Sequence, residues 1–146
     1  MNSISASGWK PKPIAHVKSV SQFWNVYQYL KRPSDLENGT QLNFFIKGIE
    51  PAWEDPNHKV GGRWQLRYPT HNPNTSNKLW EELTLAFIGN LFTYPNEVTG
   101  VQISIRKKRD IISIWNKNGN DQEIKNTIRN DCIKLMGLPE KSFFEY

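Results

Sequence analysis

The sequence has few of the features that mark secreted or membrane-embedded proteins. Its 146 residues include a single cysteine, Cys132, which excludes an internal disulfide framework and is typical of a reducing compartment. No apolar run approaches the ~18 residues of a membrane span, and the first residues lack the apolar core of a signal peptide. We therefore expect a cytoplasmic or nuclear protein that contacts no membrane and folds as one domain.

Residues that would hold a metal or perform catalysis are also scarce. The three histidines, His16, His58 and His71, lie in scattered, loop-like contexts, and we predict that they are surface residues. No His and Cys spacing typical of a metal site is present. We therefore predict a protein that is not an enzyme, with no catalytic residue, metal or cofactor. A remote alternative is a metal-dependent hydrolase that uses acidic residues of the segment 50–55.

Aliphatic side chains are sparse, whereas aromatic side chains are abundant. Apolar residues make up 37% of the chain, but Phe, Trp and Tyr make up 12%, including six tryptophans. This number exceeds the need of an ordinary core of this size, so some rings are candidates for ligand contact. The formal charge of 19 − 14 = +5 is compatible with a phosphate-bearing partner, although many proteins with such a charge bind nothing acidic.

The apolar pattern predicts an α+β domain, with residues 16–146 as the domain and residues 1–15 as a flexible N-terminal segment. A capping box, Ser19 to Gln22, begins a helix that ends before Pro33. Further helices are predicted over 76–92 and from residue 120. Alternating apolar residues predict strands at 41–46, 64–68, 101–106 and 111–115, with a short last strand at 143–146. The pattern implies one antiparallel sheet with the helices on a single face. The other face is then free to hold a ligand.

The six tryptophans divide by context. Trp64 lies on the apolar face of a strand and Trp80 on the apolar stripe of a helix, so both are predicted core residues. Trp24 also lies on the apolar stripe of a helix, where it is either a core residue or a residue that faces a partner. Trp53 lies in a loop between two prolines, where it is either folded back as a plug or held out for stacking.

The parity of the predicted hairpin places Trp115 away from the core. If Ile112 and Ile114 face the helices, Ser113 and Trp115 face the opposite side of the sheet. The same argument on the partner strand predicts Arg106 on the face of Trp115. Residues 107–109 form a basic tip, which is either a ligand-binding element or an ordinary solvated turn.

Five segments in order resemble the eukaryotic translation initiation factor 4E family of mRNA cap-binding proteins. They are residues 20–24 (VSQFW), 48–55 (GIEPAWED), 61–64 (GGRW), 79–89 (LWEELTLAFIG) and 110–117 (DIISIWNK). The resemblance covers about residues 17–146, and the last segment is closer to the 4E-homologous branch. It implies a single curved antiparallel sheet, with three helices on the convex face and a cap site on the concave face.

The resemblance also implies roles for individual residues in binding the 7-methylguanosine triphosphate of capped mRNA. Trp53 stacks on the methylated guanine, and Trp115 contacts its methyl group. Glu54 accepts hydrogen bonds from guanine N1–H and the exocyclic amine, whereas adenine has an acceptor at N1. Arg106 and Lys108 contact the cap phosphates. Trp9 is the one candidate for a second stacking ring.

A second site is implied on the helical side. Val20, Trp24, Glu82 and Leu85 match positions that receive a helix bearing tyrosine and leucine from scaffold or regulatory proteins. The predicted state of the chain is a monomer that binds capped mRNA and such proteins. The alternative is a protein-interaction module or translational repressor of the same fold in which cap binding is weak or lost.

The sequence departs from the family pattern in three places. No tryptophan-rich first strand precedes Trp9, which implies either a truncated chain or a sheet without that edge strand. Trp9 lies about two residues nearer Trp24 than the pattern requires, and the chain ends before the family's C-terminal loop. Ile111 stands where the family has a lysine for the phosphates, a loss that the basic residues 107 and 109 can offset. These departures predict a weaker affinity for the cap than the family's best.

Overall fold

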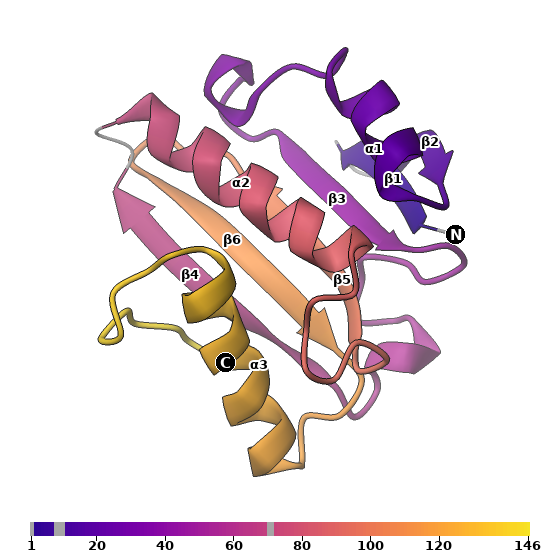
Figure 1. Ribbon diagram of the computed structural model, residues 1–146, viewed down its shortest axis with the longest axis vertical. Helices are drawn as coiled ribbons and strands as arrows, with labels where there is room; N and C mark the ends of the chain where they lie inside the picture. The colour runs from indigo at the N-terminus through magenta and orange to yellow at the C-terminus, as the bar shows by residue number, and fades with distance from the viewer. Residues whose placement is uncertain (1, 8–10, 70–71) are drawn as a thin grey trace.

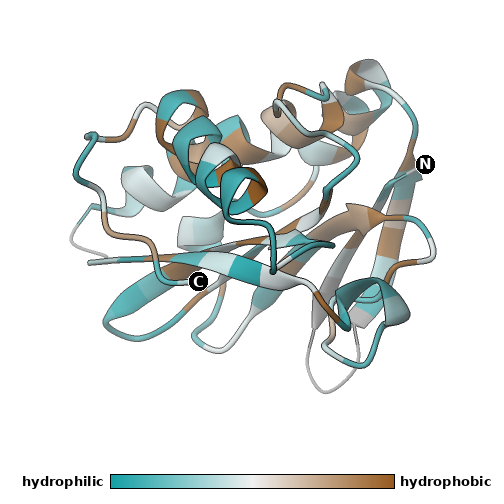
Figure 2. Cartoon of the chain, turned by 90° about the horizontal axis from the view of Figure 1, so that it is seen from below, coloured by the Kyte–Doolittle hydropathy of each residue, from teal (hydrophilic) through white to brown (hydrophobic). Residues whose placement is uncertain are grey.

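A computed structural model describes the chain except residues 1, 8–10 and 70–71, so Trp9 and His71 lie outside the described residues. Six strands form one antiparallel sheet in the order β2-β1-β3-β5-β6-β4. The three α-helices cover one face of this curved sheet, and loops with the short 3-10 helix η2 lie over the other (Figures 1 and 2). The elements in chain order are β1 (Asn2–Ser7), β2 (Pro11–Val17), α1 (Val20–Tyr27), η1 (Pro33–Asp35), β3 (Gln41–Ile46), η2 (Pro56–His58), β4 (Gly62–Pro69), α2 (Pro73–Ile88), β5 (Val98–Ser104), β6 (Arg109–Asn116) and α3 (Gln122–Leu135).

The core lies between the helices and the sheet. Apolar side chains of β3, β5 and β6 that point to the helical face are fully buried, as are those of α2 and α3 that point back at them. Members with no measurable exposure include Phe44, Leu83, Val101, Ile103, Ile112, Ile114, Ile128 and Cys132. Trp64 and Trp80 belong to this core, as predicted. Burial raises the pKa of the Cys132 thiol far above its ordinary value, so this cysteine stays protonated.

Local signals in the sequence set the helix ends. Ser19 caps α1 by accepting a hydrogen bond from the Gln22 N–H at 3.1 Å, and the Gln22 side chain accepts from the Lys18 N–H at 2.8 Å. The predicted capping box is therefore present, with its return bond one residue earlier. Asp121 caps α3. After α3, Gly137 has a φ of +62°, a left-handed conformation that glycine adopts without strain.

The N-terminal segment and the second helix differ from their predictions. The segment expected to be flexible over residues 1–15 contains β1 and most of β2, which pair with each other and, through β1, with β3. The helix predicted over 76–92 is α2, which spans 73–88, because Asn72 caps it and Pro73 is suited to its first turn. Leu91 therefore falls beyond the helix and is 60% exposed, although its spacing continued the apolar stripe.

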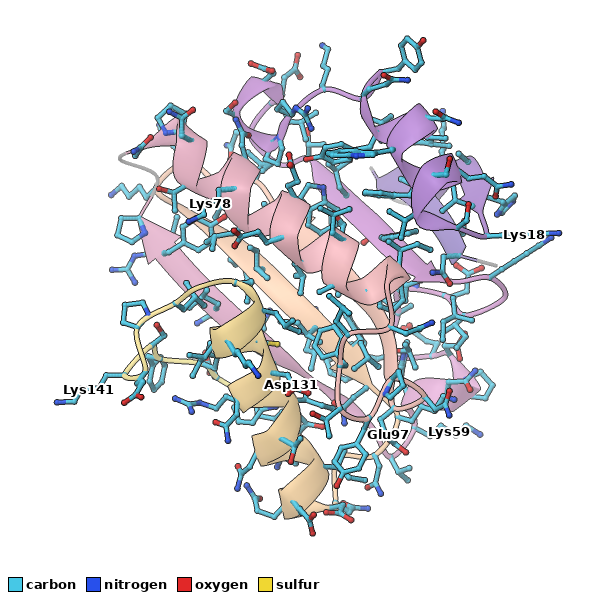
Figure 3. All side chains as sticks on the ribbon, viewed as in Figure 1. Lys18, Lys59, Lys78, Glu97, Asp131 and Lys141 are labelled. Atoms are coloured by element: carbon cyan, nitrogen blue, oxygen red, sulfur yellow. The ribbon has the colours of Figure 1, made fainter. Side chains whose placement is uncertain are left out.

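The C-terminal residues complete the sheet, in part as predicted. Gln65 on β4 and Glu145 exchange two backbone hydrogen bonds of 2.7 and 2.9 Å, which form an isolated bridge rather than a full strand. Charged side chains lie mainly at the periphery, where Lys18 and Lys141 extend at opposite sides of the molecule (Figure 3). None of the helices in the described ranges is long and apolar enough to span a bilayer.

Candidate functional site

The strand register places Trp115 on the concave face, as parity predicted. Trp115 on β6 lies opposite Arg63 on β4 and opposite Gly100 on β5. Its neighbour Ile114 points into the core beneath the helices. A Cβ at Gly100 would lie 2.3 Å from the ring of Phe45, so glycine is needed here for Phe45 to lie across β5 toward Trp115.

Four rings form an aromatic cluster on this face: Phe45, Trp53, His58 and Trp115. The ring centroid of Trp115 is 4.5 Å from that of Trp53, 4.7 Å from His58 and 6.1 Å from Phe45. These neighbours reduce the exposure of Trp115 to 1%, whereas Trp53 remains 51% exposed. The indole N–H of Trp115 is buried and meets no acceptor among the described residues. A buried donor without a protein partner is costly, and packing alone does not account for it here.

The loop that carries Trp53 is held by the carboxylate of Asp55. One oxygen accepts from the Glu50 N–H at 2.7 Å, and the other accepts from the backbone and side chain of Asn57 at 2.8 and 2.9 Å. Burial acts to raise the pKa of Asp55, but these hydrogen bonds outweigh burial and hold the pKa below its ordinary value. Because both oxygens are engaged within the loop, Asp55 is poorly placed to hold a metal for hydrolysis.

His58 ties the same loop to the sheet, contrary to its prediction as a surface residue. It is only 2% exposed. Its Nδ1 lies 2.8 Å from the carbonyl oxygen of Ala52, and its Nε2 lies 2.9 Å from the hydroxyl of Thr99. The register of β5 against β6 shifts between Val98 and Gly100, and a bulge of this kind re-aims the side chain at its centre. His16, in contrast, is exposed as predicted.

Arg63 is a site residue that the sequence analysis did not assign. Its guanidinium carbon lies 5.2 Å from the ring centroid of Trp53 and 5.0 Å from that of Trp115, within cation–π range. Desolvation, aided by the nearby charge of Arg67, lowers the pKa of Arg63, which still remains charged at neutral pH. Alternation with the core residue Trp64 is the sequence signal that places Arg63 on the concave face.

The remaining predicted cap residues lie at two places, one beside the cluster and one at the far end of the sheet face. Glu54 is exposed and follows Trp53 directly in the chain. Arg106 and Lys108 are exposed in the turn between β5 and β6, beyond the last paired residue of β5. Trp115 is six residue steps along β6 from Arg109, so the tip is about 20 Å along the strand from the indole. Parity thus placed Arg106 on a strand, whereas the structure places it in the turn.

Asp110 fixes the turn that carries Arg106 and Lys108. It is buried, and one carboxylate oxygen accepts from the Arg106 N–H at 3.1 Å. The other oxygen accepts from the Ser76 hydroxyl at 2.6 Å and so links the turn to the first part of α2. The nearby Tyr68 hydroxyl is buried, and burial raises the pKa of Tyr68 far above its ordinary value. The turn is therefore an anchored element and not a free loop.

A row of uncharged polar side chains crosses the concave face between the cluster and the turn. The Gln102 amide donates to the Asn43 oxygen at 2.7 Å, and the Ser104 hydroxyl donates to the Gln41 oxygen at 3.2 Å. Asn43, Gln102 and Ser113 are each at most 2% exposed. These residues form a rigid polar floor that connects the aromatic end of the face to its basic end.

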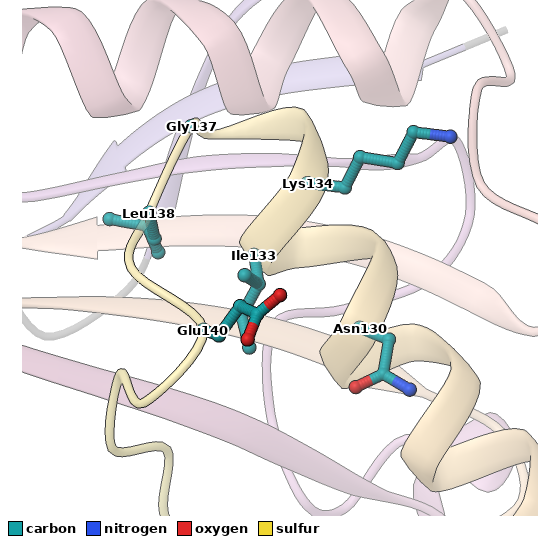
Figure 4. A pocket seen from close by; sticks show the side chains of 6 residues that line it. All are labelled: Asn130, Ile133, Lys134, Gly137, Leu138 and Glu140. Carbon is teal, nitrogen blue, oxygen red and sulfur yellow. The ribbon is translucent and has the colours of Figure 1, made fainter.

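Two hollows help to delimit the site. One, of about 290 Å³, lies beside Trp53 and Arg63 and is also lined by the C-terminal Tyr146. A larger one, of about 620 Å³, lies along the last part of α3 and contains no aromatic side chain (Figure 4). Its lining residues are Asn130, Ile133, Lys134, Gly137, Leu138 and Glu140. Stacking chemistry is therefore available at the concave face and not at the larger hollow.

The residues predicted for partner binding lie on the helical side. Val20 is 43% exposed and Trp24 is 42% exposed on α1. The Trp24 indole rests on Phe23 and Tyr27, with centroids 6.2 and 5.3 Å apart, so a rigid base holds its exposed part. Glu82 and Leu85 on α2 are half-buried.

Comparison with known proteins agrees with this geometry. The family model described as "Eukaryotic initiation factor 4E" matches residues 6–146, nearly the whole chain. The chain belongs to the eukaryotic initiation factor 4E family. Eukaryotic translation initiation factor 4E-4 of Caenorhabditis elegans is 37% identical over 135 residues, which are 92% of this chain and 62% of that relative. The initiation factor NCBP of Oryza sativa subsp. japonica is 36% identical, over 92% of this chain and 58% of its own length.

Solved structures of 4E proteins share the fold. The complex of Caenorhabditis elegans eIF4E-3 with the 4E-binding protein Mextli has a TM-score of 0.94 at 23% identity, over 99% of this chain and 88% of that one. The complex of Ascaris suum eIF4E-3 with m7G cap has a TM-score of 0.92 at 24% identity, over 98% and 85%. The predicted α+β fold of the 4E family is thereby confirmed. The chain spans less than two thirds of the two curated relatives.

Proposed function

We propose that this 4E-family chain binds the 7-methylguanosine cap of mRNA without altering it chemically and so acts in the control of translation initiation. The observation that carries the proposal is the half-exposed indole of Trp53, held against Trp115 with Glu54 exposed beside it. Relatives with the same fold were solved in complex with cap. The proposed place of action is the cytoplasm, where capped mRNA is translated.

The chemistry of the cap accounts for this arrangement. Methylation at N7 gives guanine a formal positive charge, and an indole face presents a negative quadrupole. Stacking contributes ~1–3 kcal/mol per base. Cation–π attraction adds ~0.5–2 kcal/mol, a term that unmethylated guanine largely lacks. In this proposal Trp53 supplies the stacking face, Trp115 meets the methyl group, and Glu54 accepts hydrogen bonds from the guanine edge.

The basic turn would bind the phosphates. Arg106 and Lys108 are exposed at the end of the concave face opposite the aromatic cluster, and Asp110 anchors their backbone. The polar floor between them carries no charge that would repel phosphate. Arg109 at the start of β6 is exposed in the same turn and can offset the missing lysine at Ile111. Trp9 stays a candidate for a second stacking ring.

Titration of the protein with 7-methyl-GTP and with GTP, followed by tryptophan fluorescence, tests the proposal. We expect 7-methyl-GTP to bind about 2- to 30-fold more tightly than GTP, the ratio that the cation–π energy supplies. Trp53→Ala should weaken binding of 7-methyl-GTP by about tenfold or more through loss of stacking. Glu54→Ala should weaken binding of both guanine nucleotides.

Trp24→Ala is the matched control, because Trp24 is a tryptophan of similar exposure on the helical side. It should leave the affinity for 7-methyl-GTP unchanged. Equal affinity of the wild-type protein for 7-methyl-GTP and GTP would contradict cap-specific binding.

A second candidate function is favoured by the exposed pair Val20 and Trp24. These apolar side chains lie on one helix, and Trp24 is rigidly supported, as is typical of an interaction hot spot. We infer that this surface receives a helix bearing tyrosine and leucine from a scaffold or regulatory protein. The eIF4E-3 protein of Caenorhabditis elegans was solved in complex with the 4E-binding protein Mextli.

A further inference from the structure

The guanidinium of Arg63 lies against aromatic rings rather than against a carboxylate within the described part of the chain. Arg67, four residues along β4 on the same face, pairs with the carboxylate of Glu145 at 2.9 Å. Among the described residues Arg63 has no such carboxylate partner, and its guanidinium instead lies over two indoles, those of Trp53 and Trp115. The electrostatic partner of Arg63 is therefore the pair of ring faces themselves.

The same contact closes the site. Trp115 is 1% exposed because it is surrounded by Phe45, His58, Trp53 and the guanidinium of Arg63. A ligand that is to touch Trp115 must therefore displace Trp53, Arg63 or both. Arg63 is free to leave because no carboxylate of the described residues holds its charge, and the hollow beside Trp53 offers it space.

We propose that Arg63 is an internal cation that occupies the indole faces in the free protein and competes there with the positive charge of a methylated guanine. The inference rests on the proposed cap binding. Its consequence concerns specificity: the cation of Arg63 opposes a cationic base more strongly than a neutral one. Arg63 therefore lowers the discrimination between methylated and unmethylated guanine that the two tryptophans would otherwise give.

Nucleosides without phosphate separate this role from a contact between Arg63 and the cap phosphates. We expect Arg63→Gln to bind 7-methylguanosine about three- to tenfold more tightly than the wild type, within the range of one cation–π contact. Guanosine should bind with little change. Arg63→Lys, which keeps the cation, should bind 7-methylguanosine like the wild type. Arg67→Gln, the matched control on the same strand and face, should have no effect.

Isothermal titration with the two nucleosides and with 7-methyl-GTP measures these affinities. Unchanged or weaker binding of 7-methylguanosine to Arg63→Gln would overturn the inference. The inference would also be overturned if Arg63→Gln weakened the binding of 7-methyl-GTP alone, which is the result expected for a residue that contacts phosphate. If the wild type and Arg63→Gln both fail to bind any methylated ligand, the proposed cap binding itself is contradicted.

The free protein provides a test that needs no ligand. With 5-fluorotryptophan incorporated, each indole gives a fluorine resonance, and single Phe substitutions of Trp24, Trp53, Trp80 and Trp115 assign the four that the test uses. We expect Arg63→Gln to shift the resonances of Trp53 and Trp115 and to leave those of Trp24 and Trp80 in place. Arg67→Gln should shift none of the four. Unshifted resonances of Trp53 and Trp115 in folded Arg63→Gln would show that the guanidinium does not occupy the rings.

Discussion

At the scale of single residues, the position of the aromatic cluster depends on His58. Its ring packs against Trp115, and its two nitrogens bridge the loop before Trp53 to the hydroxyl of Thr99. Because the Ala52 carbonyl can only accept, Nδ1 is the nitrogen that carries a proton, and a neutral ring then accepts from Thr99 through Nε2. His58 therefore holds the loop of Trp53 close to Trp115 through its hydrogen bonds to the Ala52 carbonyl and the Thr99 hydroxyl.

Replacing His58 tests this role. His58→Ala removes both hydrogen bonds and leaves a cavity against Trp115, so we expect the free energy of unfolding to fall by ~2–4 kcal/mol. Urea denaturation measures this change. Thr99→Val removes only one of the two bonds and keeps the volume, and a loss of ~1–2 kcal/mol is expected. If His58→Ala were as stable as the wild type, the hydrogen bonds of His58 to Ala52 and Thr99 would not stabilise the fold.

Single residues also show where sequence reasoning succeeds and where it ends. The face of Trp115 followed from strand alternation, because parity needs no knowledge of the tertiary fold. The burial of His58 did not follow, because its partner Thr99 is 41 residues away and reaches it through a bulge in β5. Arg63 could have been placed by its alternation with Trp64. Its contact with two indoles depends on how the loop folds back, which no local pattern encodes.

At the scale of elements, the loop from Glu50 to His58 behaves as a unit organised by Asp55. Its carboxylate caps η2 and also accepts from the Glu50 N–H, and these bonds lower its pKa in the folded state. A lowered folded pKa means that the ionised form stabilises the fold. This contribution is fully present above the unfolded pKa of about 4 and is lost as the pH falls through the folded pKa.

Asp55→Asn should therefore change how stability depends on pH. We expect the variant to be less stable than the wild type at neutral pH, with a difference that is constant above about pH 5 and narrows below about pH 4. Urea denaturation at a series of pH values between 3 and 7 measures it. Asp35→Asn, at an exposed aspartate of η1, is the control and should follow the wild-type curve. A difference for Asp55→Asn that does not narrow in acid would refute the assigned role of its charge.

The helices and strands differ in how clearly the sequence predicts them. α1 begins at the capping residue that was predicted, whereas α3 is capped by Asp121, one residue later than the predicted start at residue 120. Strands β3 to β6 overlap the segments in which alternation predicted strands. β1 escaped prediction because its segment is rich in serine, so that Ile4 is its one large core side chain. β2 contains prolines, which a central strand excludes but an edge strand tolerates, and β2 lies at the edge of the sheet. Edge position is a property of the whole sheet and cannot be read from the strand itself.

At the scale of the whole molecule, the sheet separates two surfaces. α1, which carries Trp24, lies with the other α-helices on one face of the sheet (Figure 1), and the aromatic cluster lies on the other, concave face. The fully buried core residues of β3, β5 and β6 stand between them. Because the two surfaces share no side chain and truncations at distant sites without common partners usually act additively, we expect the two surfaces to be altered independently.

Paired truncations test this independence. Trp24→Ala should weaken binding of a synthetic helix bearing tyrosine and leucine by about tenfold or more, as loss of a hot-spot ring does. The same variant should keep its affinity for 7-methyl-GTP, whereas Trp53→Ala should show the reverse. Fluorescence anisotropy of the labelled peptide and titration of 7-methyl-GTP measure the two affinities on the same samples. Each variant thus serves as the control for the other. A ring that is half-exposed on one face has no direct contact with a ligand on the other face. If either variant lost both binding activities, the two faces would therefore be coupled through the sheet.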